Sequence, residues 1–198
     1  MAVTAVFLDV GETLADETDY WGTVADRVGI PRLTFFAAAG ALIERGERDH
    51  RRIFELFDVD PAESDRRFTL YADALPCLVR LRDAGYLVGL AANQPEWATA
   101  ALQHAGVEVD LVATSAGWGV SKPSPAFFQR IVEAAERPAA EIAYVGDRVD
   151  NDVEPALAAG MVAVHIRRGP WGYLQRGRER ATVCIDSLAE LPGALADA

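Results

Sequence analysis

Short apolar segments alternate with helical patterns over most of the chain, and this alternation restricts the possible fold more than any other feature. Five apolar segments have the length and composition of buried strands: residues 2–8, 86–92, 110–114, 141–145 and 161–166. Helical patterns precede three of them, at residues 75–84, 125–136 and 153–159. Alternation at this spacing is typical of a parallel sheet covered by helices on both faces. We therefore predict an α/β fold, with a last strand at residues 182–185 and a last helix at residues 188–195.

A long stretch near the start of the sequence interrupts this alternation. Residues 15–73 contain no convincing strand pattern, and three of their segments are helical in character: 18–28, 33–46 and 50–57. A connection between a strand and a helix usually needs only a few residues. We therefore predict a helical insertion between two parts of one core, residues 1–14 and 74–198. Its place directly after the first strand suggests a lid over a site; a structural appendage is the alternative.

Polar residues follow the ends of the predicted strands. Asp9, Asn93, Ser115 and Asp147 each stand at or just past the carboxyl end of a different strand. In open parallel sheets, ligands bind beyond these ends. We therefore expect the four side chains to converge, although they are distant in sequence.

The residue types near these strand ends indicate metal and phosphate chemistry. Asp9, Asp147 and Asp152 offer carboxylate oxygens, which hard cations such as Mg²⁺ prefer. A carboxylate such as Asp9 can also attack phosphorus as a nucleophile. Lys122 is the only lysine among 198 residues, against eighteen arginines, and its ammonium group could neutralise a phosphate and the nucleophile together. The alternatives are a turn-capping Asp, acids that stabilise a helix N-terminus and a surface lysine.

The composition argues against several classes of function. A net charge of −11 disfavours a nucleic-acid partner. No apolar run approaches the roughly 18 residues of a membrane span, and we see no signal-peptide pattern. Cys77 and Cys184 lie far apart without a metal-binding motif, so we interpret both as core thiols of a cytoplasmic protein. The histidines are scattered and suggest no catalytic role: His50, His104 and His165.

Four motifs, taken in order, resemble those of the haloacid dehalogenase-like hydrolase superfamily. DVGETL matches its first motif, AAN its second, the KP dipeptide its third and GDRVDND its fourth, and the helical insertion lies where the superfamily carries a C1 cap. The resemblance covers the whole chain. It implies a Rossmann-like core with a small helical cap, Mg²⁺ as cofactor and a small phosphorylated molecule as substrate.

The resemblance also implies roles for particular residues. Asp9 would be the nucleophile that forms an aspartyl-phosphate, and Lys122 would neutralise the phosphate. The metal would be held by Asp9, Asp147, Asp152 and the backbone carbonyl of Gly11, with Asp152 supporting either the metal or the lysine. Independently of the resemblance, Asn93 ends the second strand, and its amide could orient a phosphate oxygen; the alternative is a turn residue.

Two positions depart from the superfamily's pattern. Its phosphatases usually carry a second Asp, as general acid and base, two residues after the nucleophile, and Gly11 stands there. Ser or Thr usually precedes the Asn of the second motif, and Ala92 stands there. The missing acid has a role worth about 10²–10⁴ in rate. Glu12 could replace it only if two neighbouring loop positions pointed the same way.

Several functions remain open at this point. The leading hypothesis is a Mg²⁺-dependent phosphatase, and the second is a catalytically impaired member that binds a ligand or a protein partner. A 2-haloacid dehalogenase would tolerate Gly11, because halide leaves without a proton, but those enzymes use no metal. A phosphonatase-like hydrolase needs a lysine in its cap to form a Schiff base, and residues 15–73 contain none.

Substrate selectivity is expected in the insertion and in the loop RRGPWG, residues 167–172. Arg167 and Arg168 stand near the end of a predicted strand, where two guanidinium groups could clamp a second anionic group. The alternative is that both are ordinary surface charges.

Overall fold

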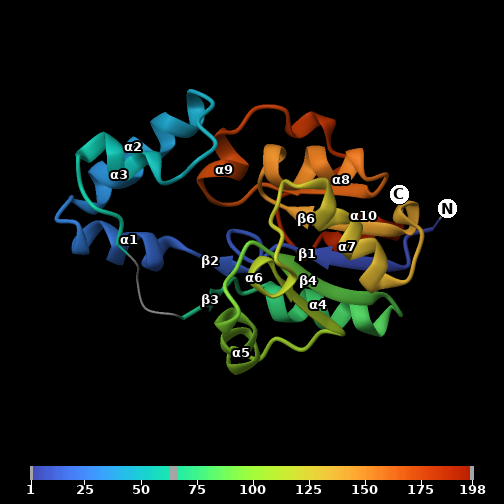
Figure 1. The fold of residues 1–198 in the computed structure, drawn as a ribbon. Coiled ribbons are helices and arrows are strands. Elements are labelled where there is room, and N and C mark those ends of the chain that lie inside the picture. The colour runs from blue at the N-terminus through green and yellow to red at the C-terminus, as the bar shows by residue number, and fades with distance from the viewer. Residues whose placement is uncertain (1, 63–66, 197–198) are drawn as a thin grey trace.

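The computed structural model describes residues 2–62 and 67–196, and it contains a six-stranded sheet with helices on both faces (Figure 1). The strands lie in the order β5-β4-β1-β6-β7-β8, and each neighbouring pair is parallel. Their bounds are β1 Ala5–Leu8, β4 Leu87–Ala92, β5 Leu111–Thr114, β6 Ile142–Gly146, β7 Val162–Ile166 and β8 Val183–Ile185. The predicted α/β class and its five main strands are confirmed.

The chain reverses its direction of travel across the sheet at β1. It runs from β1 to β4 and β5 on one side, and then crosses over to β6, β7 and β8 on the other. Adjacent strands whose connections leave in opposite directions open a crevice at their carboxyl ends. The loops that follow β1 and β6 therefore meet at the position where such a fold binds its ligand.

Side chains alternate between the two faces of β1. Val6 and Leu8 belong to an apolar cluster with residues of α4, α5 and α10, whereas Ala5 and Phe7 belong to a cluster with residues of α7 and α8. The helices of these two clusters are α4 Ala74–Asp83, α5 Trp97–His104, α7 Pro125–Ala135, α8 Glu154–Ala158 and α10 Leu191–Ala196. Two further helices, α6 Ser115–Trp118 and α9 Gly169–Leu174, come after β5 and β7 in the chain. The two clusters fix the sheet between its helical layers, and this rigid core holds the strand ends in place.

The stretch between β1 and α4 forms three helices away from the sheet (Figure 1). They are α1 Thr18–Arg27, α2 Arg32–Glu44 and α3 Arg52–Phe57, and they share an apolar cluster of their own that includes Val24, Phe35 and Phe54. A two-stranded antiparallel sheet of β2 Ala15–Asp16 and β3 Thr69–Leu70 closes the base of this helical insertion. Residues 63–66 of the predicted insertion lie outside the described residues.

The helical insertion contacts the core near α9. Glu44 of α2 forms an ion pair of 2.7 Å with Arg176, and the backbone carbonyl of Arg48 accepts a 2.9 Å hydrogen bond from Arg148. Figure 1 shows α9 beside α2, far from both chain ends. The insertion therefore lies on the same side of the molecule as the loops that follow the strands.

One sequence interpretation is wrong in part. Cys77 is buried on α4 as expected, but Cys184 is exposed. Cys184 lies on β8, which is the edge strand, and its neighbour Ile185 points to the core instead. Because successive strand residues face opposite sides, an edge strand leaves one of them in solvent.

Among the described residues, the helices are all too short or too polar to cross a membrane.

Candidate active site

Three acids and the single lysine meet at the carboxyl ends of β1 and β6. Asp9 directly follows β1, and Asp147 directly follows β6. The ammonium nitrogen of Lys122 lies 2.8 Å from Asp9 Oδ1 and 2.7 Å from Asp152 Oδ1, and its side chain is only 1% exposed. Asp9 and Asp152 lie far apart in the sequence, and the structure joins them through this one lysine.

The three acids also present a set of oxygens that fits a divalent cation. One carboxylate oxygen from each of Asp9, Asp147 and Asp152 lies within 4.8 Å of the others. Three buried carboxylates against one ammonium group leave an excess of negative charge, which is costly in a buried site without a cation. Hard oxygen ligands of this kind suit Mg²⁺.

The electrostatics of the cluster follow from burial and from close like charges. Burial raises the pKa of Asp147 well above its ordinary value, and the neighbouring Asp152 and Asp9 raise it further. Burial also raises the pKa of Asp152, to about 6, although Lys122 opposes this. Burial alone would lower the pKa of Lys122, but the two carboxylates that it contacts raise it well above its ordinary value. The lysine therefore remains a cation.

A glycine and a turn of π-helix allow Asp152 to reach this cluster. A Cβ at Gly146 would overlap the carboxyl group of Asp152, so the approach depends on the absence of a side chain there. Asp152 lies in the π-helical turn Val149–Val153, and its Oδ2 accepts a 3.0 Å hydrogen bond from the backbone N–H of Arg148. Its other oxygen is then directed at Lys122. Such π-helical turns often occur at functional sites.

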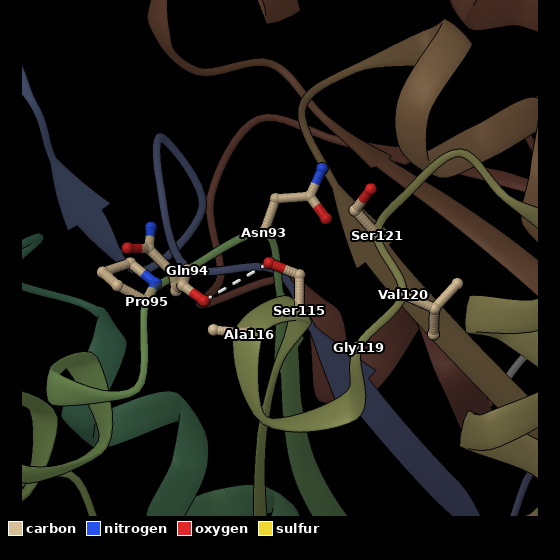
Figure 2. Close-up of a pocket in the computed structure, with 8 residues that line it drawn as sticks. All are labelled: Asn93, Gln94, Pro95, Ser115, Ala116, Gly119, Val120 and Ser121. Atoms are coloured by element: carbon tan, nitrogen blue, oxygen red, sulfur yellow. Dashed lines mark hydrogen bonds between the residues drawn. The ribbon is translucent and has the colours of Figure 1, made fainter.

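Asn93 holds the backbone of the lysine loop. Its Oδ1 accepts a 2.8 Å hydrogen bond from the Lys122 N–H, and its Nδ2 donates a 3.0 Å hydrogen bond to the Lys122 carbonyl. Figure 2 shows Asn93 and Ser115 among the residues that line a pocket beside this loop, and the Ser115 hydroxyl donates to the Gln94 carbonyl at 3.3 Å. Asn93 thus positions the lysine and lies with Asp9 and Asp147 as expected, whereas Ser115 does not line the cavity that these three residues share.

The two arginines expected to clamp a substrate have partners in the protein. Arg167 pairs with Asp186 at 2.6 Å, and its side chain is 38% exposed. Arg168 is buried, donates a 2.7 Å hydrogen bond to the carbonyl of Thr13 and pairs with Asp73. Neither residue is among the described residues that line the cavity beside Asp9 and Lys122. The arrangement makes Arg168 a support for the first motif loop.

Glu12 and Glu17 lie next to Gly11 and have different surroundings. Glu12 Oε2 accepts a 2.5 Å hydrogen bond from the Tyr71 hydroxyl, and its Oε1 accepts a 3.0 Å hydrogen bond from the Glu17 N–H. Glu17 is the residue before α1, and its Oε2 accepts a 3.1 Å hydrogen bond from Trp21 Nε1. Burial, followed by the charge of Glu12, raises the pKa of Glu17 to about 7. Sequence reasoning considered Glu12 but missed Glu17, because no motif or strand end marked it.

A cavity of about 760 Å³ lies between this cluster and the helical insertion. Asp9, Gly11, Lys122 and Asp147 line one part of it, together with Glu17. Aromatic and aliphatic side chains line much of the rest, among them Trp21, Phe35, Phe36, Leu42, Ile53 and Trp171. The insertion also contributes polar side chains, among them Glu47, Asp49, His50 and Arg67. The cavity therefore joins the acids to a wall that is partly aromatic and partly polar.

Comparison with known families identifies the class of protein to which this fold and site belong. The family model for a haloacid dehalogenase-like hydrolase matches residues 3–160. The chain belongs to the haloacid dehalogenase-like hydrolase family.

Among curated proteins, the chain is similar to phosphatases. It is 40% identical over 111 residues to a glyceraldehyde 3-phosphate phosphatase of Methanopyrus kandleri, a match that covers 51% of this chain and 45% of that protein. It is 35% identical over 107 residues to a phosphoserine phosphatase of Thermus thermophilus, a match that covers 52% of this chain and 43% of that protein. The match therefore spans less than half the length of these relatives.

Solved structures share the whole fold. A HAD phosphatase from Thermococcus onnurineus superposes with a TM-score of 0.67 at 27% identity, over 98% of both chains. An L-2-haloacid dehalogenase from Xanthobacter autotrophicus superposes with a TM-score of 0.72 at 17% identity, over 98% of both chains. At that low identity the second likeness concerns the fold alone.

Proposed function

We propose that the protein is a Mg²⁺-dependent phosphatase that hydrolyses a small phosphate ester through an aspartyl-phosphate at Asp9. The observation that carries this proposal is the convergence of three buried carboxylates around one buried lysine at the ends of β1 and β6. The sequence similarity to two kinds of phosphatase supports the same reaction. We place the reaction in the cytoplasm.

In the proposed reaction each residue acts through its position. Asp9 attacks phosphorus and receives the phosphoryl group, and water then releases it. Lys122, fixed through its backbone by Asn93, offsets the negative charge of the transferred group. Asp9, Asp147, Asp152 and the carbonyl of Gly11 would hold Mg²⁺. When bound, the cation would neutralise charge on the phosphate oxygens.

We further propose that the substrate is a small phosphorylated molecule with an apolar body. The cavity that contains Asp9 and Lys122 continues into the aromatic lining provided by the helical insertion. Burial of an apolar group there would contribute about 25 cal/mol per Å² removed from water. We propose that the helical insertion, residues 15–73, acts as a cap over residues 1–14 and 74–198 and excludes water from the site.

A screen of phosphorylated metabolites and aryl phosphates, with Mg²⁺ and with EDTA, tests this function. We expect release of phosphate from some of these esters, its loss with EDTA and its recovery with excess Mg²⁺. Turnover that does not depend on metal, together with chloride release from chloroacetate, would favour a dehalogenase. Binding of phosphate esters without turnover would favour the catalytically impaired alternative.

A further inference from the structure

The carboxyl group of Glu17 occupies the space that a side chain at position 11 would fill. A Cβ built on Gly11 would lie 2.7 Å from Glu17 Oε1, 3.0 Å from Glu17 Cδ and 3.4 Å from Glu17 Oε2. A side chain at position 11 would therefore project directly into the Glu17 carboxyl group. Glycine at this position is the condition for the approach of Glu17, since any Cβ would require the carboxyl group to move.

The Glu17 carboxyl group is held in a defined orientation. Trp21, one turn further along α1, donates its indole N–H to Oε2 at 3.1 Å, and the Glu17 backbone N–H is fixed by Glu12 Oε1 at 3.0 Å. Oε2 is the oxygen that accepts from Trp21, and Oε1 is the oxygen nearest to the Gly11 position. Glu17 lines the same cavity as Asp9 and Lys122.

The neighbouring Glu12 cannot take the same position. Both of its oxygens accept hydrogen bonds, one from Tyr71 at 2.5 Å and the other from the Glu17 backbone at 3.0 Å. A Cβ at Gly169 would overlap the side chain of Glu12, which shows that this side chain extends toward α9. Glu12 therefore supports the loop, and Glu17 is the acid that faces Gly11.

We propose that Glu17 is a catalytic residue that protonates the oxygen of the leaving group, so that it replaces the acid missing from position 11. This inference rests on the proposed phosphatase function. In the first step, Asp9 Oδ forms a bond to phosphorus, the bond from phosphorus to the ester oxygen breaks, and that oxygen takes the proton of the Glu17 carboxyl group. In the second step, the Glu17 carboxylate accepts a proton from water as the water oxygen attacks phosphorus and the bond to Asp9 breaks.

The proposed acid belongs to the helical insertion and not to the sheet. Glu17 immediately precedes α1, just after β2. A movement of the insertion relative to the core would therefore carry the acid toward or away from Asp9. In this arrangement, proton donation and the closing of the cavity would depend on the same segment.

The test is the first turnover of two esters that differ by one methylene group in the leaving alcohol. Para-nitrobenzyl phosphate releases a poor leaving group that needs a proton, whereas para-nitrophenyl phosphate releases a good one. For Glu17→Gln with Mg²⁺ present, rapid-quench measurements should show alcohol release from the benzyl ester slowed by about 10²–10⁴-fold. Release from the phenyl ester in the first turnover should change by less than about tenfold. A merely structural role would slow both esters alike, and that result would overturn the proposal.

A matched control and a rescue variant sharpen this test. Asp16→Asn removes a neighbouring acid from the same cavity, where its side chain accepts from the Thr18 N–H at 2.9 Å; it should affect the two esters equally. The double variant Gly11→Asp with Glu17→Ala places a carboxyl group at position 11 in the space vacated by Glu17. It should recover benzyl ester release relative to Glu17→Ala alone. No recovery in a folded double variant would count against the proposal, whereas an inactive parent protein would instead refute the phosphatase function.

Discussion

At the scale of single residues, the proposed function requires Asp9 to act as a nucleophile and not as a structural acid. Asp9→Asn is isosteric, so the strand end and its surroundings should persist. The amide cannot form the acyl phosphate, and turnover of the best ester from the screen should fall at least about 10²-fold. Circular dichroism should be unchanged. If the variant kept a tenth or more of the parent activity, Asp9 would not be the attacking group.

A second prediction at this scale concerns His165 and the stability of the folded protein. This residue lies fully buried on β7, and burial, followed by the charge of Arg178, lowers its pKa from 6.5 to about 4. The unfolded chain therefore binds more protons than the folded one between these two values. Stability should fall as the pH is lowered from about 6.5 to about 4, and the denaturant midpoint should follow it.

The variant His165→Leu serves as the control for this effect. Its denaturant midpoint should depend less on pH in the same window, because other acids titrate identically in both proteins. Parallel midpoint curves for the two proteins would show that His165 does not contribute to the acid sensitivity.

At the scale of elements, the helical insertion is expected to close over the site. Its strands β2 and β3 form the base, and Arg148 joins the fourth motif to the insertion by donating to the Arg48 carbonyl at 2.9 Å. Hydrogen exchange with vanadate, a phosphate analogue, should show protection near residues 14–17 and 71–75 and on the face of α2 that lines the cavity. Identical exchange with and without vanadate would instead make the insertion a structural appendage.

The elements also show what the sequence could predict and what it could not. The strands and the acids at their ends were predictable, because apolar segments mark buried strands and the ends of parallel strands meet at one edge. Even Lys122 could be identified, since its isolation in composition and its KP context singled it out. Glu17 was not predictable, because its contact with Gly11 depends on how a long insertion folds back toward the first strand. The partners of Arg168, which are Thr13 and Asp73, are equally non-local.

At the scale of the whole molecule, a bound cation should stabilise the fold. Mg²⁺ held by Asp9, Asp147 and Asp152 would bind the folded chain in preference to the unfolded one. At ten times the dissociation constant it would add about 1.4 kcal/mol to the free energy of unfolding. Thermal unfolding with increasing Mg²⁺ should therefore show a rising midpoint, and Asp147→Asn should reduce the rise. An equal rise in both proteins would place the binding elsewhere.

The burial of Lys122 has a consequence for chemical labelling of the protein. It is the only lysine in the sequence, and its side chain is 1% exposed and held between two acids. Reagents that acylate amines will find no lysine side chain on the native surface. Acylation of residue 122, followed by mass spectrometry, would therefore report opening events that release this lysine. One native side chain thus supplies a built-in probe of how often the candidate active site becomes accessible, and no label has to be introduced.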